Sequence, residues 1–447
     1  MTVADRILAP TQSFTRWGLG HALPRTAMAG RARRGDLQAM AMQASRSSQD
    51  LPLALFDDIR AAGPFYRGHF AWTTGRHAVV RETLTSPDVQ VGIGLPTDAP
   101  LARLFRWAAA SAPMGPLVPP SLLATEPPDH TRMRKLVTRV FTVRAVQRLQ
   151  VRTEEIAGEL LDDLGELGTG ADGPVDLVDA YAAALPVTVI CEVLGVPAHE
   201  RGVVRHFGTM AAPSLDMGLA LPTFVRVERA LREFDAWLRD HVEAVRRSPG
   251  EDLLSQLVAA RDEDGATLSD DELIATAGLV LAAGFETTVN LIGNGIALLA
   301  EHPDQRRALV AGEASWGGAV DEVLRYDPPV LLTGRTVARD TEIAGTRLRR
   351  GAVVTTVLAA ANRDPEVFAD PHRFDVTREN AAEHLSFSGG RHYCLGAALA
   401  RMEGEVALRA LHERFPDLAV APGAERRHTR ILRGYERLPV VLPVPQR

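Results

Sequence analysis

The sequence of 447 residues has only two cysteines, Cys191 and Cys394, and a single lysine, Lys135. Two distant cysteines make no disulfide framework, which fits a reducing cytoplasm. They also fall short of the four Cys or His ligands that structural zinc and cysteine-ligated iron–sulfur clusters generally use. The net charge of −6 gives no reason to expect nucleic-acid binding.

Long apolar runs are scarce as well. The N-terminal region has Arg6, Arg16 and Arg25 but no continuous apolar stretch, so we expect no secretory signal. No uncharged run of about 18 apolar residues indicates a membrane span. Hydrophobic residues make up 46% of the chain and charged residues 24%, as in ordinary globular proteins. We therefore expect a cytoplasmic monomer with no nucleic-acid partner and no membrane span.

Helical patterns dominate, which predicts a mainly α fold with a minor β region. Residues 1–50, rich in Arg, Ala and Ser, are expected to form a partly mobile lead-in, and residues 51–447 a single domain. Apolar periodicity predicts helices at 129–141, 146–164, 177–194 and 223–247, and strand signals lie at 65–75, 333–356 and 436–443. The segments 89–120 and 211–221 are predicted to be lid or binding loops.

The stretch FSGGRHYCLG, residues 387–396, combines a glycine-rich turn with a cysteine. Gly389 and Gly390 allow a close backbone approach. Residues 395–415 have helical periodicity, so Cys394 is expected at a helix N-terminus, which favours a thiolate. Such a thiolate is a metal ligand or a nucleophile, and the alternative is a buried cysteine before an ordinary helix. A cysteine protease needs a positioned His that nothing local specifies, whereas one thiolate suffices for haem.

This stretch resembles the haem-ligand loop of the cytochrome P450 superfamily, Phe-x-x-Gly-x-His/Arg-x-Cys-x-Gly. The matching residues are Phe387, Gly390, His392, Cys394 and Gly396. Many members have Gly at the position of Ser388, a small departure. The resemblance implies the P450 fold, with a long central helix over haem b (iron protoporphyrin IX), a cysteine-ligand loop beneath it, and Cys394 as the iron ligand.

A second signature lies in a long apolar helix. Ser269 to Glu272 form a capping box that predicts a helix to about Ala300. A membrane span is disfavoured because Glu286 near its centre would cost about 2.5–3.5 kcal/mol. Gly284 weakens the helix interior, and the Thr287 hydroxyl can bond a carbonyl one turn back. A bent helix with a buried polar cluster is the alternative to an oxygen-activating groove.

Residues 283–288, AGFETT, resemble the central-helix motif of the family, Ala/Gly-Gly-x-Asp/Glu-Thr-Thr/Ser. The resemblance implies that Thr287 is the oxygen-activating hydroxyl and Glu286 the acid of a proton relay. Ala283 and Gly284 are then expected to contact the haem.

A third signature is the pair Glu322 and Arg325, three residues apart on a predicted helix. Such a pair is normally worth only about 0.2–0.5 kcal/mol. It resembles the Glu-x-x-Arg signature of the family because an Asp-Pro-Pro break and a strand region follow. Arg373, in the sequence PHRF, matches the arginine that completes this cluster. All three are expected to be structural and to support the cysteine loop.

The two haem carboxylates would need Arg or His donors. The resemblance implies four of them: His130, Arg134, Arg335 and His392. His130 and Arg134 lie four apart and hence on one helix face.

The resemblance implies a haem-thiolate monooxygenase that inserts one oxygen atom from O2 into a lipophilic substrate by hydroxylation or epoxidation. Electrons are expected from a ferredoxin and its reductase, with Arg391, Arg401 and Arg139 as a docking patch. The expected substrate contacts are Leu279, Ala282, Val330, Leu331, Leu332, Ile431 and Leu432. Two alternatives stay open: a peroxide-driven or non-oxidative haem-thiolate enzyme, and a non-catalytic haem sensor or carrier.

Overall fold

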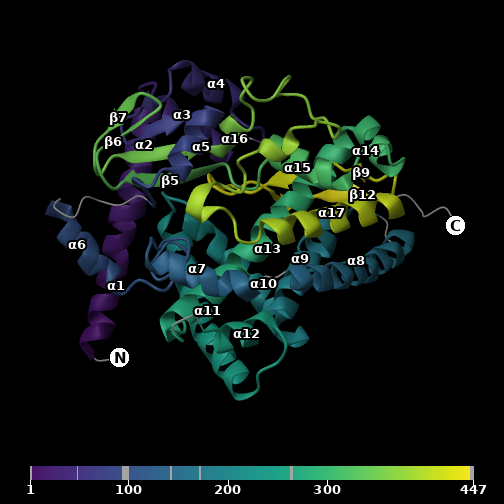
Figure 1. Cartoon of the computed structure of the whole chain (residues 1–447), viewed down its shortest axis with the longest axis horizontal. Helices are drawn as coiled ribbons and strands as arrows, with labels where there is room; N and C mark the ends of the chain where they lie inside the picture. Colours follow the sequence, from purple (N-terminus) through teal and green to yellow (C-terminus); the bar gives the residue numbers. More distant parts are fainter. Residues whose placement is uncertain are drawn as a thin grey trace.

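The fold is organised around helix α13 (Asp270–Glu301), which runs through the middle of the molecule (Figure 1). The computed structural model describes residues 3–47, 49–92, 100–140, 143–170, 173–261 and 265–442. The predicted capping box is confirmed: the Ser269 hydroxyl accepts from the Glu272 N–H at 3.3 Å, and the Glu272 carboxylate accepts from the Ser269 N–H at 2.8 Å. This helix alone among the described ones is long and apolar enough to cross a membrane, but most of that window is buried inside the protein.

Other helices surround α13 and bury its sides in one large apolar core. Helix α17 (Ala397–Arg414) follows the cysteine loop and packs against α13 and the long α8. The helices of this part are α7 (Asp129–Val140), α8 (Val143–Gly170), α9 (Ala184–Val193), α10 (Arg201–Ala211), α11 (Leu221–Arg247), α12 (Leu253–Ala259), α14 (Pro303–Val310) and α15 (Trp316–Tyr326). The mainly helical prediction is confirmed, and its helix boundaries shift by a few residues.

A five-stranded sheet forms the opposite side of the molecule, in the order β1-β2-β8-β5-β3. Its strands are β1 (Tyr66–Arg67), β2 (Trp72–Thr74), β3 (Val89–Val91), β5 (Leu332–Val337) and β8 (Val353–Val357). Helices α4 (Leu53–Ala61), α5 (His77–Thr85) and α16 (Leu358–Ala361) lie beside it (Figure 1). This confirms the strand signals at 65–75 and 333–356.

The remaining strands are short. β4 (Val175–Asp176), β12 (Pro439–Val441) and β9 (Ala419–Val420) form a small sheet, and β6 (Thr341–Ile343) pairs with β7 (Thr346–Leu348). Strands β10 (Glu425–Arg426) and β11 (Tyr435–Arg437) form an antiparallel pair. We call residues 425–437 the C-terminal hairpin, because it packs on α13 and contributes to the site.

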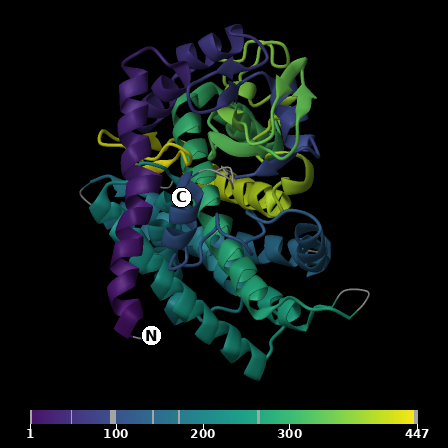
Figure 2. The same ribbon diagram turned by 90° about the vertical axis from the view of Figure 1, so that its left-hand side faces the viewer.

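The first fifty residues are largely helical: α1 (Val3–Trp17), the π-helix η1 (Gly18–Ala22), α2 (Leu23–Ala32) and α3 (Leu37–Ser47). Figure 2 shows α1, in purple, along one flank of the molecule. There the Arg16 guanidinium pairs with Glu228 of α11, and the Gln12 amide donates to the Trp107 carbonyl of α6 (Pro100–Ala109) at 2.9 Å. Helix α1 thus bridges two elements that are far apart in sequence. The division at residue 50 stays a prediction.

Candidate active site

The cysteine loop adopts a conformation that requires glycine at position 390. Gly390 has φ +63°, and a Cβ there would lie 2.5 Å from the Leu84 carbonyl oxygen of α5. Ser388 also has a positive φ, +62°. The Cys394 N–H donates to the Phe387 carbonyl at 2.9 Å, which closes the loop. The Cys394 side chain is accessible, whereas Cys191 is buried.

Helix α17 begins at Ala397, three residues after Cys394. Although Cys394 is accessible at the surface, the protein atoms around it desolvate the thiol and raise its pKa, and the Gly396 N–H and the charges of Arg134 and Arg401 only partly oppose this effect. The Gly396 N–H at the start of the helix acts in the predicted direction and favours the thiolate, but in the protein without a bound metal desolvation is the larger effect. A bound metal cation would supply the missing stabilisation, since a coordinating thiol is deprotonated.

One face of α13 is open although the helix is otherwise buried. Ala283 is exposed, and Leu279 and Thr287, one turn before and after it, are partly exposed. Positions four apart lie on the same helix face, so these side chains border a common space. The Thr287 hydroxyl donates to the Ala283 carbonyl at 2.8 Å, as predicted. At Gly284 an added Cβ would lie 3.0 Å from Ile190 of α9, so glycine also permits close helix packing there.

Polar groups without an anionic partner lie near the cysteine loop. The rings of His130 and His392 are 4.4 Å apart, and the buried His130 Nε2 has no hydrogen-bond partner among the described residues. Arg335 is 5% exposed, and the hydrogen bonds found for it go to Thr333, Gly334 and Ser388, all neutral groups. Burial lowers the pKa of Arg335 to about 10. A buried guanidinium and an unpartnered imidazole suit an incoming carboxylate.

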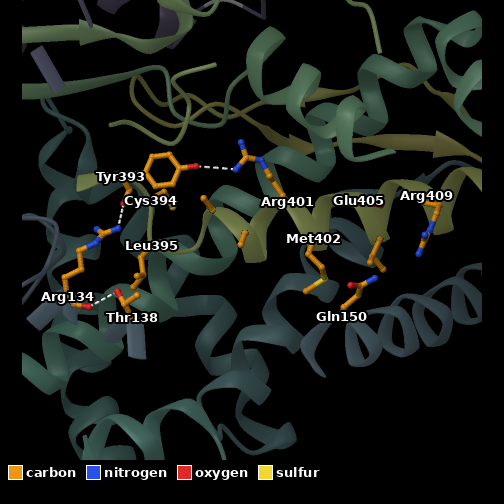
Figure 3. A pocket seen from close by; sticks show the side chains of 13 residues that line it. Arg134, Thr138, Gln150, Tyr393, Cys394, Leu395, Arg401, Met402, Glu405 and Arg409 are labelled. Carbon is orange, nitrogen blue, oxygen red and sulfur yellow. Dashed lines mark hydrogen bonds between the residues drawn. The ribbon is translucent and has the colours of Figure 1, made fainter. Parts of the chain in front are cut away.

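Arg134, the fourth predicted anchor, donates to the Tyr393 carbonyl at 2.6 Å and so lies beside the cysteine loop (Figure 3). Together, an accessible thiol, an open helix face and buried cationic donors fit the requirements of a haem group with its two carboxylates.

Glu126 is a residue of this region that sequence reasoning missed, although it lies four residues before His130. Its carboxylate is 2.7 Å from Arg391 and 3.4 Å from His392. Burial tends to raise the pKa of Glu126, but hydrogen bonds from His392 and Val91 and the Arg391 charge outweigh it and lower the pKa to about 2. Glu126 therefore fixes Arg391 and His392 of the cysteine loop.

The predicted charge cluster forms, but with a different third member. Arg325 makes two hydrogen bonds to Glu322, of 2.7 and 2.8 Å, and both side chains are fully buried. Arg373 is 65% exposed and lies 3.8 Å from Asp375, so its predicted place in the cluster is wrong. Arg378, 8% exposed and 3.2 Å from Glu322, completes the cluster instead. Arg373 contributes only its carbonyl, which accepts from Arg325 at 3.1 Å.

Glu286 does not share the open face with Thr287. It is 3% exposed and forms an ion pair with Arg427 of the C-terminal hairpin. Burial raises the pKa of Glu286, and Arg427 acts in the opposite direction. A further buried carboxyl, Glu403 of α17, has a pKa well above the usual range because of burial, and it hydrogen-bonds to Thr288. Sequence reasoning missed both Arg427 and Glu403.

The predicted substrate contacts fall into two groups. Leu279 and Ala282 line a small cavity together with residues from α10, α11 and the 114–116 segment. Val330 pairs with Leu432, and the Leu331 N–H donates to the Ile431 carbonyl at 2.8 Å. Leu332 follows in β5 and is 9% exposed. The side chain of Leu331 instead packs with Phe56 and Ile59 in a separate core, because alternate residues point to opposite sides. The prediction for Leu331 is therefore wrong.

A recess of about 650 Å³ lies beside Cys394, between α7, α8 and α17, and Figure 3 shows the side chains that line it. Arg134, Arg401 and Arg409 line it, with Tyr393 at its edge. Of the predicted docking patch, Arg401 lies here and pairs with Asp321 at 2.7 Å, whereas Arg391 pairs with Glu126. The Arg139 side chain lies outside the described residues, as do residues 93–99 of the first predicted loop.

Comparison with known proteins agrees with this geometry. A family model described as Cytochrome P450 matches residues 217–311 and 318–429. A Mycobacterium tuberculosis protein called putative cytochrome P450 140 is 47% identical over 431 residues, which cover 95% of this chain and 97% of that protein. These matches include the central helix, the charge cluster and the cysteine loop. The chain therefore belongs to the cytochrome P450 family.

Two further relatives are informative. The 6-deoxyerythronolide B hydroxylase of Saccharopolyspora erythraea is 45% identical over 324 residues, 71% of this chain and 77% of that enzyme. The structure of P450BioI, in complex with acyl carrier protein ligated to hexadec-9Z-enoic acid, superposes with a TM-score of 0.79 at 30% identity, covering 90% of this chain and 100% of that one. The protein is thus a cytochrome P450 monooxygenase with the fold of that family, and its cofactor is haem.

Proposed function

We propose that the protein is a cytoplasmic, monomeric monooxygenase that holds haem b and oxidises a large lipophilic substrate with electrons from a ferredoxin and its reductase. The overall reaction consumes one O2, two electrons and two protons, and yields one hydroxylated or epoxidised product and one water. The observation that carries this proposal is the accessible Cys394 thiol in a glycine-shaped loop, next to the buried Arg335 guanidinium, which bonds only neutral groups, and the buried His130 Nε2, which has no partner among the described residues.

Different residues of this chain would bind the iron and the carboxylates of the cofactor. Cys394 would ligate the iron, while His130, Arg134, Arg335 and His392 would hold the two carboxylates. When bound, the haem would supply O2 binding and cleavage of the O–O bond, which thiolate ligation favours. Phe387 and Gly390 shape the loop that presents the cysteine, and the small side chain of Ala283 leaves room on the open face of α13.

The residues that would deliver protons lie on α13. The Thr287 hydroxyl borders the open face and is already oriented by its bond to the Ala283 carbonyl. It can pass a proton to a group bound in that space. Glu286 is the adjacent acid, and a carboxyl whose pKa is raised by burial accepts and releases protons closer to neutral pH. Such general-acid assistance is worth roughly 10²–10⁴-fold in rate.

The substrate class follows from the apolar walls. The cavity beside Leu279 and Ala282 is lined mainly by apolar residues, among them Met114, Ala211 and Phe234. One relative named above is a hydroxylase of 6-deoxyerythronolide B, and another holds a carrier-bound C16 acyl chain. A polyketide or acyl substrate from secondary metabolism is therefore favoured. Absorbance titration of the haem-loaded protein with 6-deoxyerythronolide B and with hexadecenoic acid tests this class, since a substrate that displaces water from the iron changes its spin state.

The recess beside Cys394 would dock the electron donor. Its arginines suit an acidic ferredoxin. Arg409→Glu should slow ferredoxin-dependent reduction severalfold at low salt. The matched control is Arg414→Glu on the same helix, which pairs with Asp162 and is not among the lining residues. Equal slowing in both variants, or none in either, would argue against this surface.

The central test is spectroscopic. The reduced, haem-loaded protein under carbon monoxide should show the red-shifted Soret band of thiolate ligation, and Cys394→Ala should lose it. Thr287→Ala should keep the band but release more of the consumed electrons as hydrogen peroxide. A wild-type protein without the shifted band contradicts the thiolate assignment, and a fully coupled Thr287→Ala variant contradicts the role given to that hydroxyl.

A further inference from the structure

A polar stripe runs along the buried helix α13. Glu286, Asn290 and Asn294 lie four residues apart and hence on one helix face, and each is at most 3% exposed. Each faces the C-terminal hairpin. Glu286 pairs with Arg427, a Cβ added to Gly434 would lie 1.9 Å from Asn290 Oδ1, and the Asn294 amide donates to the Arg433 carbonyl at 3.2 Å. The hairpin therefore contacts the stripe over about two helical turns.

The base of the hairpin is fixed to the body of the protein. Arg426 and Arg433 both pair with the buried Asp327, at 2.7 and 2.5 Å. Arg426 also donates to the Asn294 side-chain oxygen at 2.6 Å. These contacts fix the position of the base relative to α13.

The tip of the hairpin, residues 428–432, is bound to the segment between α10 and α11. The carboxylate of Asp216, 5% exposed, accepts the N–H groups of Arg430 at 3.0 Å and Ile431 at 3.1 Å. The Arg430 guanidinium donates to the Met217 carbonyl at 2.6 Å. We call residues 212–220 the lid segment, because it joins the two helices that wall the apolar cavity over α13. The same tip carries Ile431 and Leu432, two of the proposed substrate contacts.

Arg427 lies between the fixed base and the tip. Its backbone N–H donates to the Gly434 carbonyl at 3.1 Å and its Nε to the Tyr435 carbonyl at 3.2 Å, so its remaining nitrogens reach Glu286 from a braced position. Because the tip begins at the next residue, a displacement of the tip would shift the Arg427 backbone and move the guanidinium relative to the carboxylate. Asn290, one turn on, has no partner among the described residues for either side-chain polar atom, so it offers an amide to a carboxylate that leaves Arg427.

We propose that Arg427 is a positioning residue that couples closure of the lid segment to the placement of Glu286, through the hydrogen bonds of Asp216 to the hairpin tip. With the lid segment seated on the tip, Arg427 holds the Glu286 carboxylate at the hairpin. When the tip moves, the carboxylate is released towards Asn290 and solvent. The consequence for proton delivery rests on the proposed function of Glu286, whereas the mechanical coupling does not. Because linkage is reciprocal, a change at Glu286 must also be felt at the lid segment.

Hydrogen–deuterium exchange of the haem-loaded ferric protein, without turnover, tests the coupling separately from the monooxygenase reaction. Asp216→Asn should accelerate amide exchange at least threefold both in residues 427–435 and in residues 284–290. Arg427→Gln and the isosteric Glu286→Gln should each accelerate exchange in the lid segment. Arg427→Lys, which keeps the charge, should remain within twofold of wild type. Arg437→Gln, an exposed arginine of the same hairpin, is the matched control and should change neither region.

A double-mutant cycle gives a second readout. The affinity of 4-phenylimidazole, measured from its absorbance shift on the haem iron, is compared for Asp216→Asn, Arg427→Gln and the double variant. Coupled residues should give a double-variant fold-change at least threefold different from the product of the two single fold-changes. The proposal is overturned if the fold-changes multiply within 1.5-fold, or if Asp216→Asn loosens residues 427–435 but leaves 284–290 unchanged.

Discussion

The charge cluster beneath the cysteine loop gives the sharpest prediction, because two nearby arginines occupy opposite environments. Arg378→Ala should destabilise the protein strongly, whereas Arg373→Ala should have little effect. Arg378 is 8% exposed and lies 3.2 Å from the fully buried Glu322. Arg373 is 65% exposed, and the nitrogen and oxygen of its ion pair with Asp375 are 3.8 Å apart.

The magnitudes follow from the partners that each change removes. Arg378 also donates to the carbonyls of Ala369 at 2.6 Å and Arg373 at 3.1 Å. Removing a partner from a buried ion pair costs about 3–5 kcal/mol. Glu322 keeps its two bonds to Arg325, so we expect the lower half of that range, about 3–4 kcal/mol. An exposed pair like that of Arg373 is worth about 0.2–1 kcal/mol.

Urea unfolding of the haem-loaded variants, followed by far-ultraviolet circular dichroism, measures both values. The carbon monoxide spectrum provides a parallel readout, because a weakened cluster should also lower the fraction of thiolate-ligated haem. If Arg373→Ala proves as damaging as Arg378→Ala, the side chain of Arg373 must reach Glu322 in solution, and the arrangement described above is wrong.

Three further predictions concern other parts of the molecule. Gly390→Ala should cost at least about 2 kcal/mol in the free energy of unfolding, because the new Cβ meets the Leu84 carbonyl at a positive φ; Gly396→Ala, with open space at its Cβ, should stay near wild type in the same urea titration. Glu126 has a lowered pKa in the folded state, so its contribution to stability is complete above the ordinary carboxyl pKa of 4.5 and is lost as the pH falls towards about 2. Glu126→Gln should therefore flatten this part of an acid-unfolding curve. An unchanged curve would contradict the ion-pair geometry. Arg16→Gln should weaken the docking of α1 by about 1–3 kcal/mol, seen as faster limited proteolysis within residues 3–32, while Arg25→Gln serves as the exposed control.

Features that depend on neighbouring residues were predictable from the sequence. The glycine-rich turn before Cys394, the capping box at Ser269 and the back-bond of Thr287 each involve residues within about seven positions of one another. Local sterics and hydrogen bonding decide such features, so a short stretch of sequence contains all the information needed.

Contacts between distant segments were not predictable in the same way. Arg373 and Arg378 lie five residues apart near the same phenylalanine, and nothing in that stretch shows which one folds back onto Glu322. Arg427 follows Glu286 by 141 positions in the chain and meets it only because the hairpin packs on α13. The raised pKa of the Cys394 thiol likewise depends on desolvation in the folded protein, which outweighs the hydrogen bond from the Gly396 N–H.

The position of α1 has a practical consequence for engineering. Its Arg16 forms an ion pair with Glu228 on α11, and its Gln12 donates a hydrogen bond to a backbone carbonyl of α6. One N-terminal helix therefore contacts both elements through specific side chains. A chimera that takes α6 or α11 from a relative, in order to change the substrate specificity, would lose one of these two contacts. Residues 3–17 should therefore be transplanted together with the imported segment, as a single exchangeable cassette.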